Sequence, residues 1–150
     1  MPNHGEKAAK MRSMVALAPD GLTGLRDRAL LLVGFAGAFR RSELVALDVA
    51  DIEETETGLL VTIRHSKLRS GRLTDRSVAN IVKAYAERAG LDATVFSGHS
   101  LRSGFLTSAA ANGASIFKMM DVSRHKSVDT LRGYVRDAEL FKDHAGTGLL

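Results

Sequence analysis

Apolar residues along this chain recur mainly at helical spacing. The segment from Thr23 to Phe39 is apolar on nearly every side, which predicts a helix buried in the core with Thr23 as its N-cap. Helical spacing continues from Arg40 to Leu47, with Glu43 on a different side from the leucines. A further helix opens at Thr74 and carries an apolar stripe made of Val78, Ile81, Val82 and Tyr85. The first half of the chain is therefore expected to be largely helical.

The second half of the chain has the same character. Gly90 is the expected C-cap of the preceding helix, and another helix is predicted from His99 to Asn112. Two shorter helices should follow, from Ser115 to Val122 and from Ser127 to Tyr134. The tail from Asp137 has weak helical character.

One stretch has the composition of a strand. Leu59 to Ile63 combines apolar and β-branched side chains, whereas the acidic segment from Asp48 to Gly58 is typical of a turn. The strand has no evident antiparallel partner, and an unpaired strand leaves backbone donors and acceptors unsatisfied. The predicted fold class is mainly α with a small β element.

The chain is long enough, at 150 residues, to form one domain with its own core. Residues 1–20 are predicted to be a polar lead-in that ends in the turn signal Pro19-Asp20-Gly21, and residues 21–150 to form the domain. The apolar run from Ala29 to Phe39 is well short of the roughly 20 residues that span a bilayer. No apolar signal segment is visible at the N-terminus, so we expect a cytoplasmic protein with no membrane partner.

Composition and charge narrow the classes of function. The chain contains no Cys, which excludes disulfides, a cysteine nucleophile and thiolate metal sites. The net charge is +4, and the basic residues are concentrated between Arg64 and Arg76. A concentrated basic segment favours a polyanionic partner such as DNA, although many basic segments are only solvated surface.

Four short segments carry candidate chemistry. In chain order they are Arg40-Arg41-Ser42-Glu43-Leu44, Lys67, His99-Ser100-Leu101-Arg102, and His125 followed nine positions later by Tyr134. The His and Arg of the third segment are three residues apart and so share a helix face. Taken singly, each segment has an ordinary structural explanation, as a surface ion pair, a solvated loop lysine, a helix cap or a core aromatic.

Together and in this order, the segments resemble the tyrosine recombinases of the phage-integrase family. That family shows an Arg followed by x-x-Glu-Leu after a buried helix, a Lys in a β-hairpin, a His-x-x-Arg helix, a later His or Trp, and a nucleophilic Tyr. The matching residues here are Arg40, Lys67, His99, Arg102, His125 and Tyr134. The segments GAFRRSELVAL, SGHSLRSGFLTSAA and HKSVDTLRGYVRDAELF are also similar, and the resemblance extends from about Leu22 to Leu140.

The resemblance implies how phosphodiester chemistry is shared among these residues. Arg40 and Arg102 would grip the non-bridging phosphate oxygens and stabilise charge in the transition state, a task that suits guanidinium better than ammonium. His99 would accept the proton of the attacking hydroxyl. Lys67 would protonate the departing 5′-oxygen, and His125 would hydrogen-bond the phosphate.

Of the two tyrosines, Tyr85 belongs to an apolar helix stripe, which leaves Tyr134 as the candidate nucleophile. Its attack would form a 3′-phosphotyrosine that stores the bond energy, so religation would need no ATP, metal or other cofactor. The resemblance also implies double-stranded DNA as substrate and a homo-oligomer, a tetramer on DNA, as the recombining unit.

The chain departs from the family in one internal region. In the family, the lysine hairpin is followed by a second strand, then further strand and helix structure. Here Lys67 is followed within a few residues by the helix that begins at Thr74, so a segment near residues 70–74 is predicted to be missing. Because of this shortening, Lys67 is not certain to reach the position that it has in the family. Whether the chain is active therefore has to be tested.

Other classes of function explain fewer residues. A non-catalytic or degenerate DNA-binding module, with residues 115–134 as a helix-turn-helix, accounts for the basic charge but makes the ordered His, Arg and Tyr a coincidence. A serine hydrolase is disfavoured because Gly98-His99-Ser100 lacks the second glycine of a nucleophile elbow. A metal enzyme is disfavoured because no helix carries a His-x-x-x-His pair.

Overall fold

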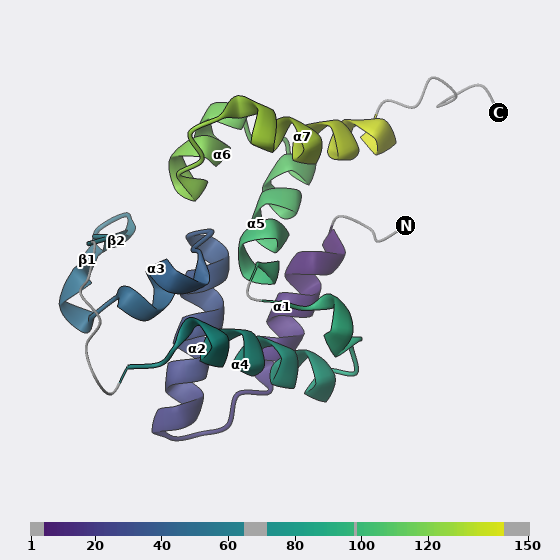
Figure 1. Cartoon of the computed structure of the whole chain (residues 1–150). Helices are drawn as coiled ribbons and strands as arrows, with labels where there is room; N and C mark the ends of the chain where they lie inside the picture. The colour runs from purple at the N-terminus through teal and green to yellow at the C-terminus, as the bar shows by residue number, and fades with distance from the viewer. Residues whose placement is uncertain (1–4, 65–71, 98, 143–150) are drawn as a thin grey trace.

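The computed structural model describes residues 5–64, 72–97 and 99–142, and it confirms the predicted fold class. In this part of the chain, helices form the body of the molecule, and two short strands and two 3₁₀ turns complete the fold (Figure 1). The helices are α1 (Gly5–Ala16), α2 (Leu22–Ala36), α3 (Arg41–Ala46), α4 (Asp75–Arg88), α5 (Ser100–Ala111), α6 (Ile116–Ser123) and α7 (Val128–Lys142). The remaining elements are η1 (Val49–Asp51), β1 (Ile52–Thr55), β2 (Gly58–Val61) and η2 (Ala93–Val95).

The N-terminal segment is not the featureless lead-in that its polar composition suggested. Residues 5–16 form α1, whose Met14 side chain is 0% exposed. The helix packs against α2, α4 and α5, so its few apolar residues add to the core even though the rest of its surface is polar. The sequence did not predict this helix, because only a narrow stripe of α1 is buried.

The larger apolar cluster, called here the N-terminal cluster, joins α1, α2, α4 and the start of α5. Its buried residues are Met11, Met14, Ala18, Leu30, Leu31, Val78, Val82, Tyr85, Ala86 and Leu101. As predicted, Thr74 opens α4, and its hydroxyl accepts a hydrogen bond from the Ser77 N–H at 3.1 Å. The predicted cap Thr23 is wrong, because α2 begins at Leu22 with Gly21 as its N-cap and no side-chain cap bond.

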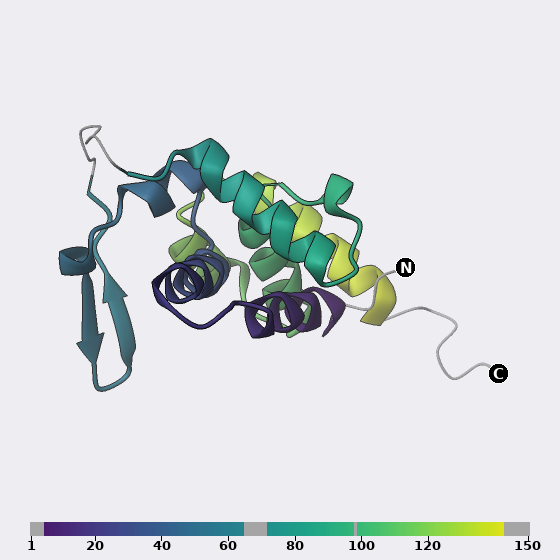
Figure 2. The same ribbon diagram turned by 90° about the horizontal axis from the view of Figure 1, so that it is seen from below.

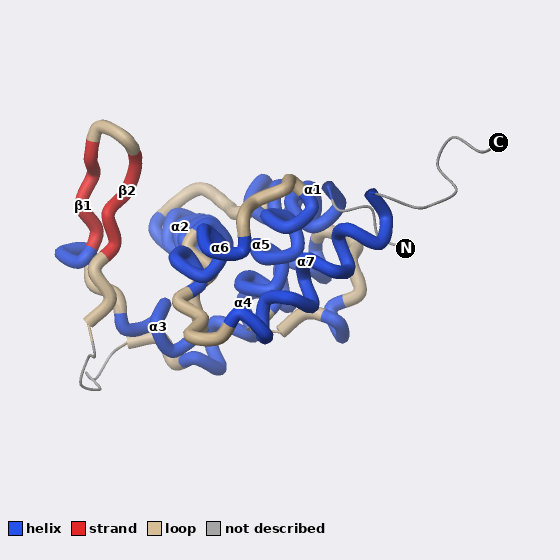
Figure 3. Tube along the Cα trace, turned by 90° about the horizontal axis from the view of Figure 1, so that it is seen from above, coloured by secondary structure: helices blue, strands red, loops and turns tan. Residues whose placement is uncertain are grey.

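The predicted lone strand has a partner. Strands β1 and β2 pair antiparallel, with Ile52 opposite Val61 and Thr55 opposite Gly58. The hairpin extends to one side of the helical body (Figures 2 and 3). The acidic composition of this segment predicted a turn, but residues 52–55 form β1. Glu53 and Glu54 are exposed there, and a two-stranded hairpin that covers little of the core does not require apolar residues.

A smaller C-terminal cluster joins the later half of α5 to α6 and α7. Its buried residues are Leu106, Ala110, Met119 and Leu131. Helix α7 runs beyond the predicted end at Tyr134 and reaches Lys142. Helices α6 and α7 lie across the far end of α5 from the N-terminal cluster (Figure 1).

Within the described ranges, no helix is both long enough and apolar enough to cross a membrane.

Candidate active site

Arg102 is a buried cation at the centre of the candidate site. It lies on α5 and is 5% exposed. Its Nη1 donates to the Ala38 carbonyl at 3.0 Å, and Ala38 belongs to the turn between α2 and α3. Burial lowers the pKa of Arg102, and the nearby Arg40 lowers it further, while Glu43 opposes both. A guanidinium keeps its charge despite such a shift, so the site holds a fixed positive charge.

His125 faces Arg102 from the loop between α6 and α7. The Arg102 Nη2 lies 3.1 Å from Nδ1 and 3.2 Å from Nε2 of the imidazole, and the Ser123 hydroxyl lies 2.7 Å from Nδ1. Burial lowers the pKa of His125, and the charges of Arg102, Arg40 and Arg124 lower it further. A neutral ring fits these contacts, because it leaves one imidazole nitrogen free to accept from the Arg102 guanidinium, which can only donate.

Arg40 precedes α3 and presents its side chain to solvent. Its backbone N–H donates to the Glu43 carboxylate at 2.7 Å, and its Nη1 lies 3.5 Å from the same carboxylate. Burial would raise the pKa of Glu43, but hydrogen bonds from Arg124 and from the Arg40 backbone outweigh it and hold this pKa below its usual value. The Arg40 side chain remains 51% exposed, so its guanidinium is accessible to a bound anion.

Tyr134 lies on α7, half-buried against the C-terminal cluster. An ionised Tyr134 would raise the pKa of Arg102, as the weakest of the influences on it, so the two side chains lie within electrostatic range of each other. No hydrogen bond within the described part of the chain engages its hydroxyl. The other tyrosine differs: Tyr85 is 2% exposed, and its hydroxyl donates to Asp27 at 2.8 Å. Tyr85 is therefore a core residue, as its helix stripe predicted.

His99 is less closely integrated. It is the N-cap of α5, three residues before Arg102, and its side chain is exposed. Among the described residues, no hydrogen bond joins its imidazole to Arg102 or His125. The structure therefore brings together Arg40, Arg102 and His125, and it leaves His99 at the rim.

Lys67 lies outside the described residues, but both flanks of its segment are anchored. Arg64 pairs with the buried Asp51 at 3.0 Å. Arg72 donates from Nη1 to the Val45 carbonyl at 3.0 Å and to the Leu47 carbonyl at 3.4 Å. Its Nη2 also bonds the carboxylate of Asp48, whose backbone N–H donates to Asp51. Residues 64 and 72 are thus both fixed to the short stretch that links α3 to β1.

Arg124 is the site residue that sequence analysis missed. It ends α6, and its guanidinium binds Glu43 with an Nη2–Oε2 distance of 2.6 Å. It lies immediately before His125 in the chain but contacts residues more than 80 positions earlier. No spacing of residues in the sequence predicts a contact between positions so far apart, so it is seen only in the tertiary structure.

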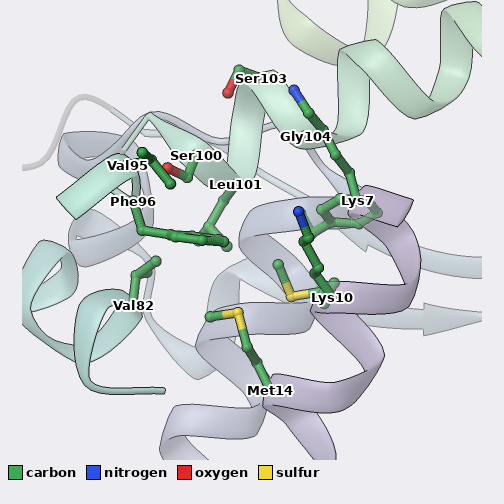
Figure 4. Close-up of a pocket in the computed structure, with 12 residues that line it drawn as sticks. Lys7, Lys10, Met14, Val82, Val95, Phe96, Ser100, Leu101, Ser103 and Gly104 are labelled. Atoms are coloured by element: carbon green, nitrogen blue, oxygen red, sulfur yellow. The ribbon is translucent and has the colours of Figure 1, made fainter. Parts of the chain in front are cut away.

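A cavity of about 280 Å³ lies elsewhere, between α1, η2 and α5. Figure 4 shows Lys7 and Lys10 at its edge and Met14, Val82, Phe96 and Leu101 around its apolar part. None of the candidate catalytic side chains lines it. Nor does any group of three or more His, Asp or Glu side chains able to hold a metal occur among the described residues.

Known proteins resemble this chain in sequence and in fold. The sequence pattern of the phage integrase family matches residues 53–140, more than half of the chain. The chain belongs to the phage integrase family. It is 34% identical to the integrase/recombinase XerD homologue of Selenomonas ruminantium, over 94% of this chain and 57% of that protein. It is 29% identical to the tyrosine recombinase XerC of Myxococcus xanthus, over 75% of this chain and 51% of that protein.

The fold is likewise that of a known recombinase. The XerH site-specific recombinase, solved in a pre-cleavage complex with its difH substrate, matches with a TM-score of 0.73 at 16% identity, over 95% of this chain and 53% of that one. Its post-cleavage complex on a palindromic difH substrate gives a TM-score of 0.74. The chain spans about half the length of the relatives it matches.

Proposed function

We propose that this chain is the catalytic part of a site-specific recombinase that cleaves and rejoins double-stranded DNA through a 3′-phosphotyrosine on Tyr134. The observation that carries the proposal is that Arg102 contacts His125 and that Arg40 lies within electrostatic range of both, with Tyr134 in the same range of Arg102. Three segments far apart in sequence supply these groups. The XerC and XerD relatives are named as recombinases, which supports the same reaction class.

Each side chain in the cluster has a distinct task in this reaction. Arg102 is already oriented by the Ala38 carbonyl and by His125, so its further N–H groups can meet a phosphate oxygen without reorganisation. Arg40 is exposed and supplies the second guanidinium. The neutral His125 can donate a hydrogen bond to the phosphate after a change of partner, without adding another full charge to a crowded cationic site.

Proton transfer is assigned to the remaining two residues. His99 stands at the rim of the site, exposed and on the same helix as Arg102, where it could accept the proton of the Tyr134 hydroxyl once DNA is bound. Lys67 would protonate the 5′-oxygen that leaves. Because Arg64 and Arg72 are both anchored beside η1, the segment that carries Lys67 starts and ends at fixed points.

We also propose that the chain lacks an internal segment present in its relatives. The alignment with the Selenomonas protein covers 194 residues, more than the 150 residues of this chain, so the relative holds residues there with no counterpart here. We place the missing segment near residues 70–74, in the connection that leads from β2 to α4. Residues 21–150 then form the catalytic domain, with α1 packed onto it.

The alternative of a helix-turn-helix module at residues 115–134 is not favoured. In this chain α7 buries Leu131 against α5 and α6. The loop between α6 and α7 presents His125 inward to Arg102. A recognition helix would leave this His125–Arg102 contact unexplained.

The test is a suicide-substrate assay on nicked duplex DNA, with a pool of attachment-like duplexes and a search for a protein–DNA adduct that resists denaturation. The wild-type chain should form the adduct, and Tyr134→Phe should abolish it. Tyr85→Phe is the matched control, because it removes the other tyrosine hydroxyl and should leave the adduct in place. Salt-sensitive binding without an adduct would instead favour a DNA-binding remnant. Cross-linking on the same duplexes would test the proposed tetramer.

A further inference from the structure

Arg124 ends α6 in a backbone conformation that residues with a side chain rarely adopt. Its φ is 60° and its ψ is 25°, in the left-handed region, and its N–H donates to the Met120 carbonyl at 2.7 Å. Glycine takes this conformation without steric cost and is the usual residue at such a helix end. An arginine in this conformation is strained, so its side-chain bonds must offset a local cost.

That side chain binds three neighbouring parts of the turn between α2 and α3. Nη1 donates to the Gly37 carbonyl at 3.0 Å, and Nη2 donates to the Ala38 carbonyl at 3.3 Å. Nη2 and Nε bind the two carboxylate oxygens of Glu43 at 2.6 and 3.4 Å. The guanidinium also lies over the Phe39 ring, 4.7 Å from its centroid. One side chain thus ties the end of α6 to residues 37–43.

The turn that Arg124 holds is also the turn that orients the catalytic cations. The Ala38 carbonyl accepts from both Arg124 and Arg102, and Ala38 itself has a positive φ of 48°. Glu43 accepts from Arg124 and from the backbone N–H of Arg40. His125, which contacts Arg102, follows Arg124 directly in the chain. Arg124 is therefore linked to each member of the cluster: to Arg40 through Glu43, to Arg102 through the Ala38 carbonyl, and to His125 as its neighbour in the chain.

The donors of Arg124 are used within the protein. Its side chain is 28% exposed and bonds three carbonyls, those of Gly37, Ala38 and Val122, and both oxygens of one carboxylate. Arg40, by contrast, is 51% exposed and has one long contact to Glu43. The two arginines differ in kind: Arg40 is open to a phosphate, whereas Arg124 is committed to protein acceptors.

We propose that Arg124 is a positioning residue for DNA cleavage: it holds the Gly37–Arg40 turn against the loop between α6 and α7, so that Arg40, Arg102 and His125 meet one phosphate. It does not itself touch that phosphate. The role in cleavage rests on the proposed function, whereas the positioning itself is a property of the free protein.

The experiment compares Arg124→Gly, Arg124→Lys and Lys126→Ala in the full chain. Glycine suits the left-handed backbone, so Arg124→Gly should remain folded while losing all side-chain bonds. Lysine keeps the charge but cannot bridge Glu43 and two carbonyls at once. Lys126→Ala is the matched control, because it removes one exposed positive charge two residues away.

Adduct formation on saturating nicked duplex should fall about 100-fold in Arg124→Gly, as expected for a small misplacement of reacting groups. It should fall less in Arg124→Lys and stay unchanged in Lys126→Ala. DNA affinity should change little in all three. A wild-type cleavage rate in Arg124→Gly would overturn the proposal. So would a loss of DNA affinity equal to that of Arg40→Ala with the rate at saturation unchanged, since this would make Arg124 a phosphate ligand.

A second readout does not depend on DNA. NMR of the free protein should show the Arg102 side-chain resonance moving in both Arg124→Gly and Arg124→Lys. The lysine variant keeps the positive charge at position 124, so its shift reports lost positioning rather than lost charge. Unchanged signals in Arg124→Gly would overturn the positioning role. If the wild-type chain forms no adduct but these signals shift, the proposed function fails and the positioning role stands.

Discussion

The N-terminal and C-terminal apolar clusters differ in what they supply to the candidate site. The N-terminal cluster supports α2 and the turn that leads to Arg40. The C-terminal cluster supports α6 and α7, with His125 in the loop between them and Tyr134 on α7. Helix α5 belongs to both, with Leu101 in the first and Leu106 in the second. Apolar packing is non-directional. It fixes each half but does not set the angle between their catalytic groups.

Directional bonds cross between the two halves. Arg102 and Arg124 both donate to the Ala38 carbonyl, and Arg124 also binds Glu43. These bonds require particular donor and acceptor positions, so a small shift of one half would break them. Stability therefore comes mainly from the two apolar clusters, whereas the relative positions of the candidate site residues come from the arginines that join the two halves.

The largest expected effects on stability come from emptying either cluster. Met14→Ala and Leu131→Ala should each lower the free energy of unfolding by about 2–5 kcal/mol, because both side chains are fully buried. Urea denaturation followed by circular dichroism measures this, and Leu22→Ala, at a site 85% exposed, is the control. If Leu131→Ala produced a separate early transition, the two clusters would be independent folding units rather than one.

Arg102→Lys should weaken the connection between the halves without removing charge. A lysine cannot hold the Ala38 carbonyl, His125 and a phosphate together, so adduct formation should fall about 10²–10³-fold. The assay is the nicked-duplex reaction at saturating DNA. Arg132→Lys, on an exposed part of α7, is the control and should react like wild type. Equal rates in the two variants would contradict the role assigned to Arg102.

Arg72→Ala tests the anchor beside the hairpin. It removes the donor for the Val45 and Leu47 carbonyls and the partner of Asp48, and should cost about 1–3 kcal/mol of unfolding free energy. Arg76→Ala, at an exposed position a few residues later, should cost little. Thermal or urea unfolding of both variants gives the comparison, and equal losses would show that the anchor is not specific.

The smallest effect is the pH dependence of stability. The pKa of His125 is lowered from 6.5 in the folded protein and that of Glu43 from 4.5, so in both cases the unfolded chain binds protons more readily. Their contributions to stability are therefore present above these values. They should be lost as pH falls, first that of His125 below about 6.5 and then that of Glu43 below about 4.5. Urea midpoints measured against pH would show this, and in His125→Gln the first step should be absent.

The sequence by itself determined the helical fold class and most of its helices, and it predicted the ordered set Arg40, Lys67, His99, Arg102, His125 and Tyr134. Helices such as α4 were predictable because their apolar stripes and caps are local signals, as Thr74 shows. The ordered set was recognisable because its residues and their order resemble the pattern of the phage-integrase family. Helix α1 and strand β1 were missed because one buries only a narrow stripe and the other pairs along an exposed hairpin.

Only the tertiary structure decided how the site is assembled. Arg102 bonds the Ala38 carbonyl 64 positions away, and Arg124 bonds Glu43 across 81 positions. Such bonds depend on how whole helices pack against one another. The spacing of residues along the chain does not contain that information. The left-handed backbone of Arg124 has the same origin, because tertiary bonds from its side chain outweigh the local preference for glycine.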